Sequence, residues 1–245
     1  MAEMSVELYR QIREDALPTE VVLEGRTYTI RNVSPVKDPV PAPFEVNTLT
    51  GLVDYLKTNV DKLNIEELIC HVESPGEVSV FTALHGPFRQ RSEFIRAKLD
   101  IEAFPFGDFI SAERFNIGLQ ACFAETPVTV DGEIRATDKG LILKMVGNVK
   151  ESMVKEVGDD GVSQSMAIKS GIAMVENIVL PNPVILRPYR TFNEVEQPAS
   201  GFVFRAQDGP RFALFEADNG VWKSEAMKSI KAFLQFEVSG LHVIA

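Results

Sequence analysis

The chain has 245 residues, of which 45% are hydrophobic and 24% are charged, so it can bury one substantial core or two small ones. Its 25 basic residues against 35 acidic residues give a net charge of −10, which argues against non-specific binding to nucleic acid or anionic membranes. No segment approaches about 18 consecutive apolar residues, and the charged N-terminal stretch lacks the apolar region of a signal peptide. We therefore expect a soluble intracellular protein.

The first 44 residues contain three short patterns. Apolar side chains at helical spacing predict a helix from Ser5 to Ala16, ended by Pro18. Two β-rich runs on either side of Glu24-Gly25 predict a hairpin. Four prolines between Val33 and Phe44 predict an extended linker.

The next segment carries the clearest helix pattern of the chain. Thr48 is suited to cap a helix whose apolar residues repeat from Leu49 to Leu63 in steps of three and four. Two strand-like runs, Leu68 to Glu73 and Glu77 to Leu84, follow and are separated by a Ser-Pro-Gly turn. These runs predict a second hairpin.

The middle of the chain is more mixed. The segment from Phe88 to Ile101 fits a strand or a helix. Ser111 is a suitable N-cap for a helix that runs to Ala124 and is stopped by Pro127. The polar, turn-rich stretch from Thr126 to Asp138 is interpreted as a flexible excursion.

From Met153 onward the hydrophobic pattern changes to a period of two, which is typical of strands. Gly158-Asp159-Asp160-Gly161 is the first predicted turn of this region. Four further strand candidates are Ile172 to Leu180, Val184 to Phe192, Gly201 to Ala206 and Arg211 to Ala217. A final helix is predicted from Val221 to Phe236, with Trp222, Ala226, Met227, Ile230, Phe233 and Leu234 on its apolar face.

These elements predict an α+β fold in two parts. Residues 1–148 form a mixed α/β part, with the proline-rich linker at 33–44 inside it. Residues 149–245 form an antiparallel β-rich part that is closed by the C-terminal helix. Whether the two parts share one core is left open by the sequence.

Motifs of known chemistry are missing from the sequence. Its three histidines, His71, His85 and His242, are widely separated, and neither cysteine belongs to a metal-binding pair. Phosphate-binding glycine loops and the nucleophile elbow of hydrolases are also absent. We therefore expect no metal, no cofactor and no enzymatic activity, and we interpret Cys70 and Cys122 as reduced core residues.

The Gly158–Gly161 segment has two interpretations. Asp159 and Asp160 can contribute to a divalent cation site or to a dispersed active site, provided that other oxygen ligands join them. The favoured interpretation is a hairpin tip, in which Asp and Gly supply left-handed turn geometry.

A polar and aromatic segment near residue 190 is the candidate ligand site. In a strand, Arg187 and Tyr189 share one face while Arg190 takes the other, so a guanidinium and a ring can meet an anion or a nucleotide. The predicted ligand-binding residues are Arg187, Tyr189, Arg190, Arg205 and Arg211. The alternative is an internal ion-pair network in which Arg187 and Arg190 meet Glu194 and Glu196.

The C-terminal half resembles uncharacterised bacteriophage and prophage proteins of the YfdQ-like group. The resemblance rests on Leu180–Pro183, Arg187–Phe192, Glu194–Pro198, Phe202–Arg205 and Leu214–Asp218, with supporting matches at Phe106–Phe109 and Gly158–Gly161. That group has no established activity or catalytic residues to transfer. The resemblance implies a phage protein in the cytoplasm of an infected bacterium.

Three functions fit this context. The first is a non-enzymatic accessory protein, homo-oligomeric, that counters host defence by binding a host factor or by sequestering a nucleotide-type signal. The second is a replication or recombination factor that acts through protein contacts or through single-stranded DNA stacked on aromatic residues, although the net charge makes nucleic acid an unfavoured partner. The third is a virion or assembly component.

Overall fold

The structure is a computed structural model of the chain. It describes residues 6–16, 20–29, 41–86, 89–130, 132–149, 154–159, 164–170, 173–179, 181–207 and 211–245. The chain divides into two compact units, Met1–Pro41 and Ala42–Ala245. Each unit is described by itself below.

The first unit contains the predicted N-terminal helix and hairpin. Helix α1 spans Val6–Ala16, and strands β1 (Glu20–Leu23) and β2 (Arg26–Thr29) pair in an antiparallel hairpin. The two turn residues, Glu24 and Gly25, have φ angles of 52° and 77°, the left-handed geometry that tight two-residue hairpin turns require. Most of the predicted linker lies outside the described residues.

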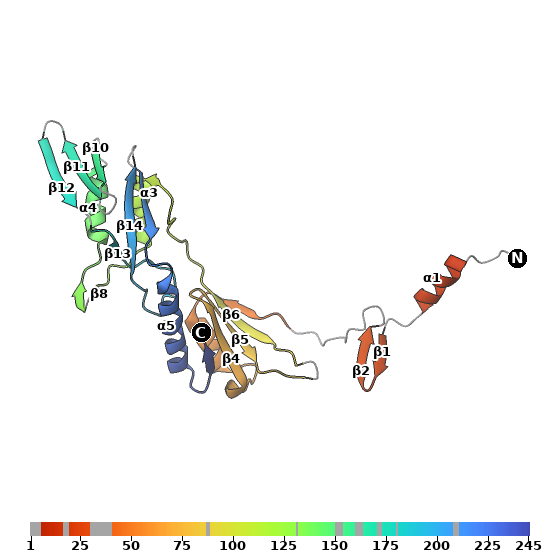
Figure 1. Cartoon of the computed structure of the whole chain (residues 1–245). Coiled ribbons are helices and arrows are strands. Elements are labelled where there is room, and N and C mark those ends of the chain that lie inside the picture. The colour runs from red at the N-terminus through yellow and green to blue at the C-terminus, as the bar shows by residue number, and fades with distance from the viewer. Residues whose placement is uncertain are drawn as a thin grey trace. The chain divides into compact units, whose positions relative to one another are not determined.

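The second unit begins with a five-stranded sheet whose strand order is β16-β4-β5-β6-β3 (Figure 1). Its strands are β3 (Phe44–Val46), β4 (Leu68–Ser74), β5 (Glu77–Thr82), β6 (Glu93–Lys98) and β16 (His242–Ile244). The β4–β5 hairpin confirms the prediction, and the segment with two interpretations contains strand β6. The edge strands β16 and β3 pair parallel to β4 and β6, so the sheet joins residues that are far apart in sequence.

Helix α2 (Leu49–Thr58) starts as predicted but ends earlier. The Thr48 hydroxyl accepts a hydrogen bond from the backbone N–H of Gly51 at 3.0 Å, which satisfies one of the free donors of the first turn. The helix ends because Asn59 adopts a left-handed conformation with φ 46°. The predicted continuation to Leu63 is therefore wrong. The short 3₁₀ helix η1 (Ile65–Glu67) follows and leads into β4.

Replacing Thr48 with alanine is expected to lower the free energy of unfolding by about 1 kcal/mol, because the Gly51 N–H loses its partner. Urea denaturation of the wild-type protein and the variant measures this difference. Thr48→Ser is the matched control, since it keeps the hydroxyl and should remain within about 0.5 kcal/mol of the wild-type value. An equal loss in both variants would show that the cap hydrogen bond is not the cause.

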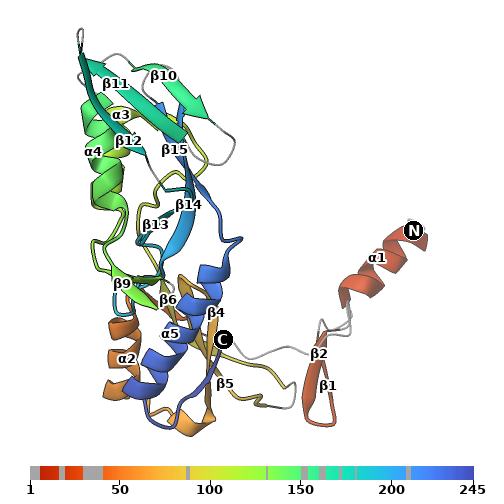
Figure 2. The ribbon, with the colours of Figure 1, turned by 60° about the vertical axis from the view of Figure 1, so that its left-hand side comes forward.

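The second sheet of this unit has four strands in the order β13-β14-β15-β7. They are β7 (Ile110–Ser111), β13 (Val184–Leu186), β14 (Ser200–Gln207) and β15 (Arg211–Glu216). Helices α3 (Ala112–Ala121) and α4 (Lys139–Val149) contact each other beside this sheet (Figure 2). Ser111 caps α3 as predicted by accepting from the Arg114 N–H.

Two smaller sheets complete the described strands. Strands β8 (Val128–Val130) and β9 (Glu133–Arg135) form a hairpin inside the segment that was predicted to be a flexible excursion. Val128 is buried, so this segment is anchored. The other sheet is an antiparallel meander of β10 (Val154–Asp159), β11 (Gln164–Ser170) and β12 (Ala173–Val179). The tip of the Gly158–Gly161 turn lies outside the described residues.

Helix α5 (Val221–Glu237) follows β15 and confirms the predicted C-terminal helix. Trp222, Ala226, Ile230 and Leu234 are buried, which is the spacing of one apolar helix face. This helix contacts β4 and the edge strand β16, as Figures 1 and 2 show. The last helix of the chain thus covers a sheet built mainly from its first hundred residues.

The second unit contains two hydrophobic clusters. One packs α3 and α4 against the four-stranded sheet and includes Phe115, Met145 and Phe202. The other packs α2 and α5 against the five-stranded sheet and includes Leu52 and Ile230. Both clusters combine residues from before and after residue 148, the predicted boundary between the two parts of the chain.

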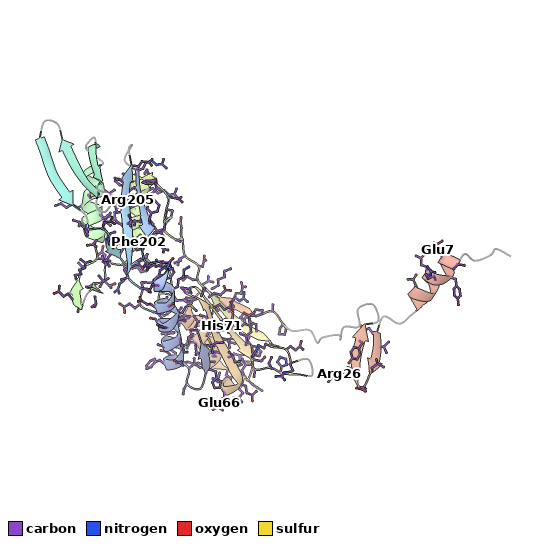
Figure 3. All side chains as sticks on the ribbon, viewed as in Figure 1. Glu7, Arg26, Glu66, His71, Phe202 and Arg205 are labelled. Carbon is purple, nitrogen blue, oxygen red and sulfur yellow. The ribbon has the colours of Figure 1, made fainter. Side chains whose placement is uncertain are left out.

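The arrangement confirms the predicted α+β class, with strands and helices in several sheets and layers. Among the described residues, no helix is both long and apolar enough to cross a lipid bilayer. Cys70 is a buried core residue as predicted, and burial raises the pKa of its thiol to about 12, while Cys122 is half-buried. His71 on β4, labelled in Figure 3, is half-buried.

Candidate functional site

The segment that joins β13 to β14, residues 187–199, is called the connector here. Leu186 before it belongs to the first cluster, whereas Phe192 and Val195 within it are buried in the second. The predicted strand from Val184 to Phe192 is therefore too long, because the chain leaves the four-stranded sheet after Leu186 to place Phe192 in the other core. The connector links the two cores of the second unit.

The start of the connector is fixed by backbone pairing with the end of α3. The Arg187 carbonyl accepts from the Ala124 N–H, and the Tyr189 N–H donates to the Cys122 carbonyl, both at 2.8 Å. Buried Lys139 holds this neighbouring segment, since its ammonium donates to the carbonyl of Phe123 at 2.7 Å. The backbone position of Arg187 is therefore fixed by β13, by the end of α3 and by Lys139 at the start of α4.

The end of the connector is fixed by Gln197, a buried side chain. Its Oε1 accepts from the N–H groups of Arg190 and Thr191, and its Nε2 donates to the carbonyls of Thr191 and Phe192. The Thr191 hydroxyl donates to the Pro75 carbonyl of the β4–β5 turn at 2.6 Å. These bonds fix the connector, because they pair its backbone groups at residues 190–192 and the Thr191 and Gln197 side chains within the fold.

A polar cavity of about 350 Å³ lies beside the connector. Residues from β8, the connector and α5 line it: Thr129, Arg187, Glu196, Gln197, Pro198, Ala199, Glu225 and Ser229. Its volume is at the lower end of the range of about 300–1,000 Å³ for ligand sites. One arginine and two glutamates line it, so the formal charge of its wall is −1.

Arg187 is the buried charge of this cavity, with only 8% of the residue exposed. Its Nη1 donates to Glu196 Oε1 at 2.5 Å, while the Glu196 side chain is 74% exposed. Within the described part of the chain, the buried Nε of Arg187 has no hydrogen-bond partner. A buried donor without a partner is costly, so this guanidinium has hydrogen-bonding capacity that the fold does not use.

Arg190 has a different environment and does not line the cavity. Its guanidinium lies 3.9 Å from the ring centroid of Trp222, donates to Glu216 at 2.7 Å, and contacts the Ser200 hydroxyl, which itself donates to Asp218. Burial lowers the pKa of Arg190 to about 10, and the carboxylates of Glu216 and Asp218 oppose that shift. Arg190 stays charged at neutral pH and joins the connector to β14, β15 and α5.

The remaining predicted site residues lie elsewhere. Tyr189 is 39% exposed and is not among the cavity residues. Arg205 lies on β14, farther along the strand than Phe202 (Figure 3), and donates to the Phe204 carbonyl at 3.4 Å. Arg211 donates to the Phe109 carbonyl and pairs with Gln207 across the strands. Gln207, the partner of Arg211, is seven residues from Ser200 at the start of β14, or about 23 Å along the strand. Arg211 is therefore far from the connector, and the structure does not bring the five predicted residues together.

The alternative interpretation, an internal ion-pair network, is confirmed in one of its pairs. Arg187 meets Glu196 as that interpretation expects, but Arg190 meets Glu216 instead of the connector carboxylates. Glu194 accepts from the Thr50 N–H at the start of α2. The distant partners Glu216, Asp218 and Trp222 were not identified from sequence, because no local pattern links them to Arg190.

The stacking surface proposed for single-stranded DNA is not available. Phe192, Phe202 and Phe204 are buried, and Phe202 and Phe204 stack on other phenylalanines of the first cluster. Only Tyr189 of the four aromatic residues is exposed. In the described part of the chain, no three His, Cys, Asp or Glu residues are grouped so as to hold a metal ion.

The cavity beside Arg187 is therefore the candidate site, and its chemistry is recognition through charge and hydrogen bonds. Three elements supply its wall, and the connector rigidly places its one cation. Comparison of the chain with protein-family models, with curated proteins and with solved structures gives no match.

Proposed function

We propose that this chain is a non-enzymatic accessory protein of a bacteriophage or prophage, and that it binds a small polar host molecule in the cavity beside Arg187. Sequestration of such a molecule, for example a nucleotide-type signal, is a means of countering host defence. The phage context is supported by the sequence resemblance in the C-terminal half. The binding function is supported by the cavity.

One observation carries the proposal. The guanidinium of Arg187 is buried at the cavity wall, and its one side-chain partner there is an exposed carboxylate. An unpaired buried donor costs about 1–3 kcal/mol, and among the described residues the buried Nε atoms of Arg187 and Arg190 both lack a partner. Only Arg187 of these two lines the cavity. A ligand that accepts hydrogen bonds from the guanidinium accounts for the placement of a buried cation at the wall of a polar cavity.

A thermal-shift screen tests the proposal. The purified protein is heated with mononucleotides, cyclic nucleotides and pools of polar metabolites. At a ligand concentration 100 times Kd, binding adds about 2.7 kcal/mol, which for a chain of this length raises Tm by about 5–10 °C. Arg187→Met should abolish the shift.

The matched control is Arg114→Met, which removes an exposed arginine on α3 outside the cavity. This variant should keep the full shift. If no compound raises Tm, the small-ligand proposal is wrong. The accessory function would then have to act through binding of a host protein. If both variants lose the shift equally, the ligand does not bind at the cavity.

A further inference from the structure

The charges around the cavity indicate the class of ligand that it selects. We infer that the cavity binds a zwitterion, a small molecule with one anionic group for Arg187 and one cationic amine for Glu196 and Glu225 in the cavity wall. This inference rests on the proposed function and specifies the ligand of the same site. Three features of the wall carry it.

The first feature is the contrast between Arg187 and Glu196. Arg187 is held by buried backbone pairing, whereas Glu196 is 74% exposed on the connector and contributes a single contact to Nη1. A planar anion that accepts two parallel N–H bonds from a guanidinium binds more strongly than a single contact does. A carboxylate of the ligand therefore competes well for Arg187, and the exposed Glu196 side chain is then available to the cationic end of the ligand.

The second feature is the acidic side of the wall. Glu225 and Ser229 are four residues apart on α5, and both line the cavity. Side chains with this spacing are neighbours on one helix face. Once Glu196 is released from Arg187, the cavity presents two carboxylates and a hydroxyl. These groups accept hydrogen bonds, and an ammonium supplies three donors.

The third feature is the total charge. The wall carries a formal charge of −1, and the whole chain carries −10, so a ligand with several negative charges is repelled at the cavity. A ligand with no net charge avoids that cost and still pairs both of its ends. The cavity volume of about 350 Å³ also suits a small molecule better than a polymer.

A set of probes with one four-carbon skeleton tests the inference. γ-Aminobutyrate carries both charged groups, butyrate carries only the anion, and n-butylamine carries only the cation. The full-length protein is titrated calorimetrically with each probe, with the twenty protein amino acids and with adenosine 5′-monophosphate. We expect γ-aminobutyrate or an amino acid to bind at least tenfold more tightly than butyrate, n-butylamine and the nucleotide.

Variants test which cavity residue binds the anionic group of the ligand and which binds its amine. Arg187→Met and Arg187→Lys should weaken binding of the zwitterion by about tenfold to a hundredfold, since charge-assisted hydrogen bonds are lost. Glu225→Gln changes a side chain that is exposed on α5, and it should weaken zwitterion binding and leave butyrate binding unchanged. Glu66→Gln on η1 is the matched acidic control and should alter neither.

The outcomes separate the inference from the proposed function. If adenosine 5′-monophosphate binds more tightly than every zwitterion and Arg187→Met removes that binding, the cavity is a ligand site but the zwitterion inference is wrong. If butyrate or n-butylamine binds as tightly as γ-aminobutyrate, the cavity does not recognise both charged groups together, and the zwitterion inference is wrong. If no probe and no compound of the thermal-shift screen binds, the small-ligand proposal and the inference both fail.

Discussion

Replacing Phe115 with alanine is expected to lower the free energy of unfolding by about 3–5 kcal/mol, because a large aromatic side chain is lost from the core. Phe115 on α3 is fully buried. Its ring lies 5.6 Å from the rings of Phe104 and Phe212 and 5.9 Å from that of Phe204, measured between centroids. The alanine variant leaves a cavity between the helix and the sheet that these rings cannot fill.

Urea denaturation, followed by far-ultraviolet circular dichroism, measures the loss. Ile117→Ala is the matched control on the same helix, because Ile117 is 61% exposed, and its effect should stay within about 0.5 kcal/mol. A loss below about 1 kcal/mol for Phe115→Ala would mean that the aromatic cluster is loosely packed, contrary to the structure.

The second large effect is expected for Arg190→Ala, with a loss of about 1–3 kcal/mol, because charge-assisted hydrogen bonds and a stacked cation are removed while the Glu216 side chain, 36% exposed, stays solvated. The substitution removes the stacked partner of Trp222 and the cation paired with Glu216. It leaves the carboxylates of Glu216 and Asp218 without the positive charge with which both interact. Trp222 is the single tryptophan of the chain, so its emission and near-ultraviolet circular dichroism report the loss of stacking directly.

The pH dependence of this variant follows from the pKa of Arg190, which is lowered to about 10 in the folded protein. Below that value Arg190 is protonated in both the folded and the unfolded state, so it exchanges no protons on unfolding. The loss in Arg190→Ala should therefore be constant between about pH 6 and pH 9. Arg190→Lys keeps the charge but not the planar guanidinium, and an unchanged stability for that variant would contradict the stacked geometry.

Local patterns in the sequence predicted the local elements well. Thr48 and Ser111 cap helices because a hydroxyl next to a run of apolar periodicity satisfies the free N–H groups of a first turn, whatever the rest of the chain does. The Glu24-Gly25 hairpin and the apolar face of α5 are equally local. The fold class follows from the order of such elements.

The connector could not be predicted in the same way. Its apolar residue Phe192 extends the pattern of β13, so the sequence favours a continuous strand, but the side chain is buried in the other core. Burial of an aromatic side chain outweighs a few residues of strand propensity, and the choice of core depends on elements far away in the chain.

The candidate site was predicted in part. Arg187 and its partner Glu196 are nine residues apart, so their pairing can be expected from the sequence. The opposite wall comes from Thr129 on β8 and from Glu225 and Ser229 on α5, which only the packing of the two cores brings to the connector. Arg205 and Arg211 flank a predicted turn, which makes them candidates to join Arg187, but the strand geometry places them away from the cavity.

The parallel pairing of β16 with β4 has a consequence for biosynthesis. Leu68–Ser74 leaves the ribosome long before residues 221–244 are made, and at about 5–20 residues per second the interval is roughly 7–35 s. During that time the buried face of the five-stranded sheet lacks α5, and the far edge of β4 lacks its neighbour. The nascent chain therefore exposes an apolar sheet with an open edge, a form that is prone to aggregate and that chaperones recognise, until synthesis reaches α5.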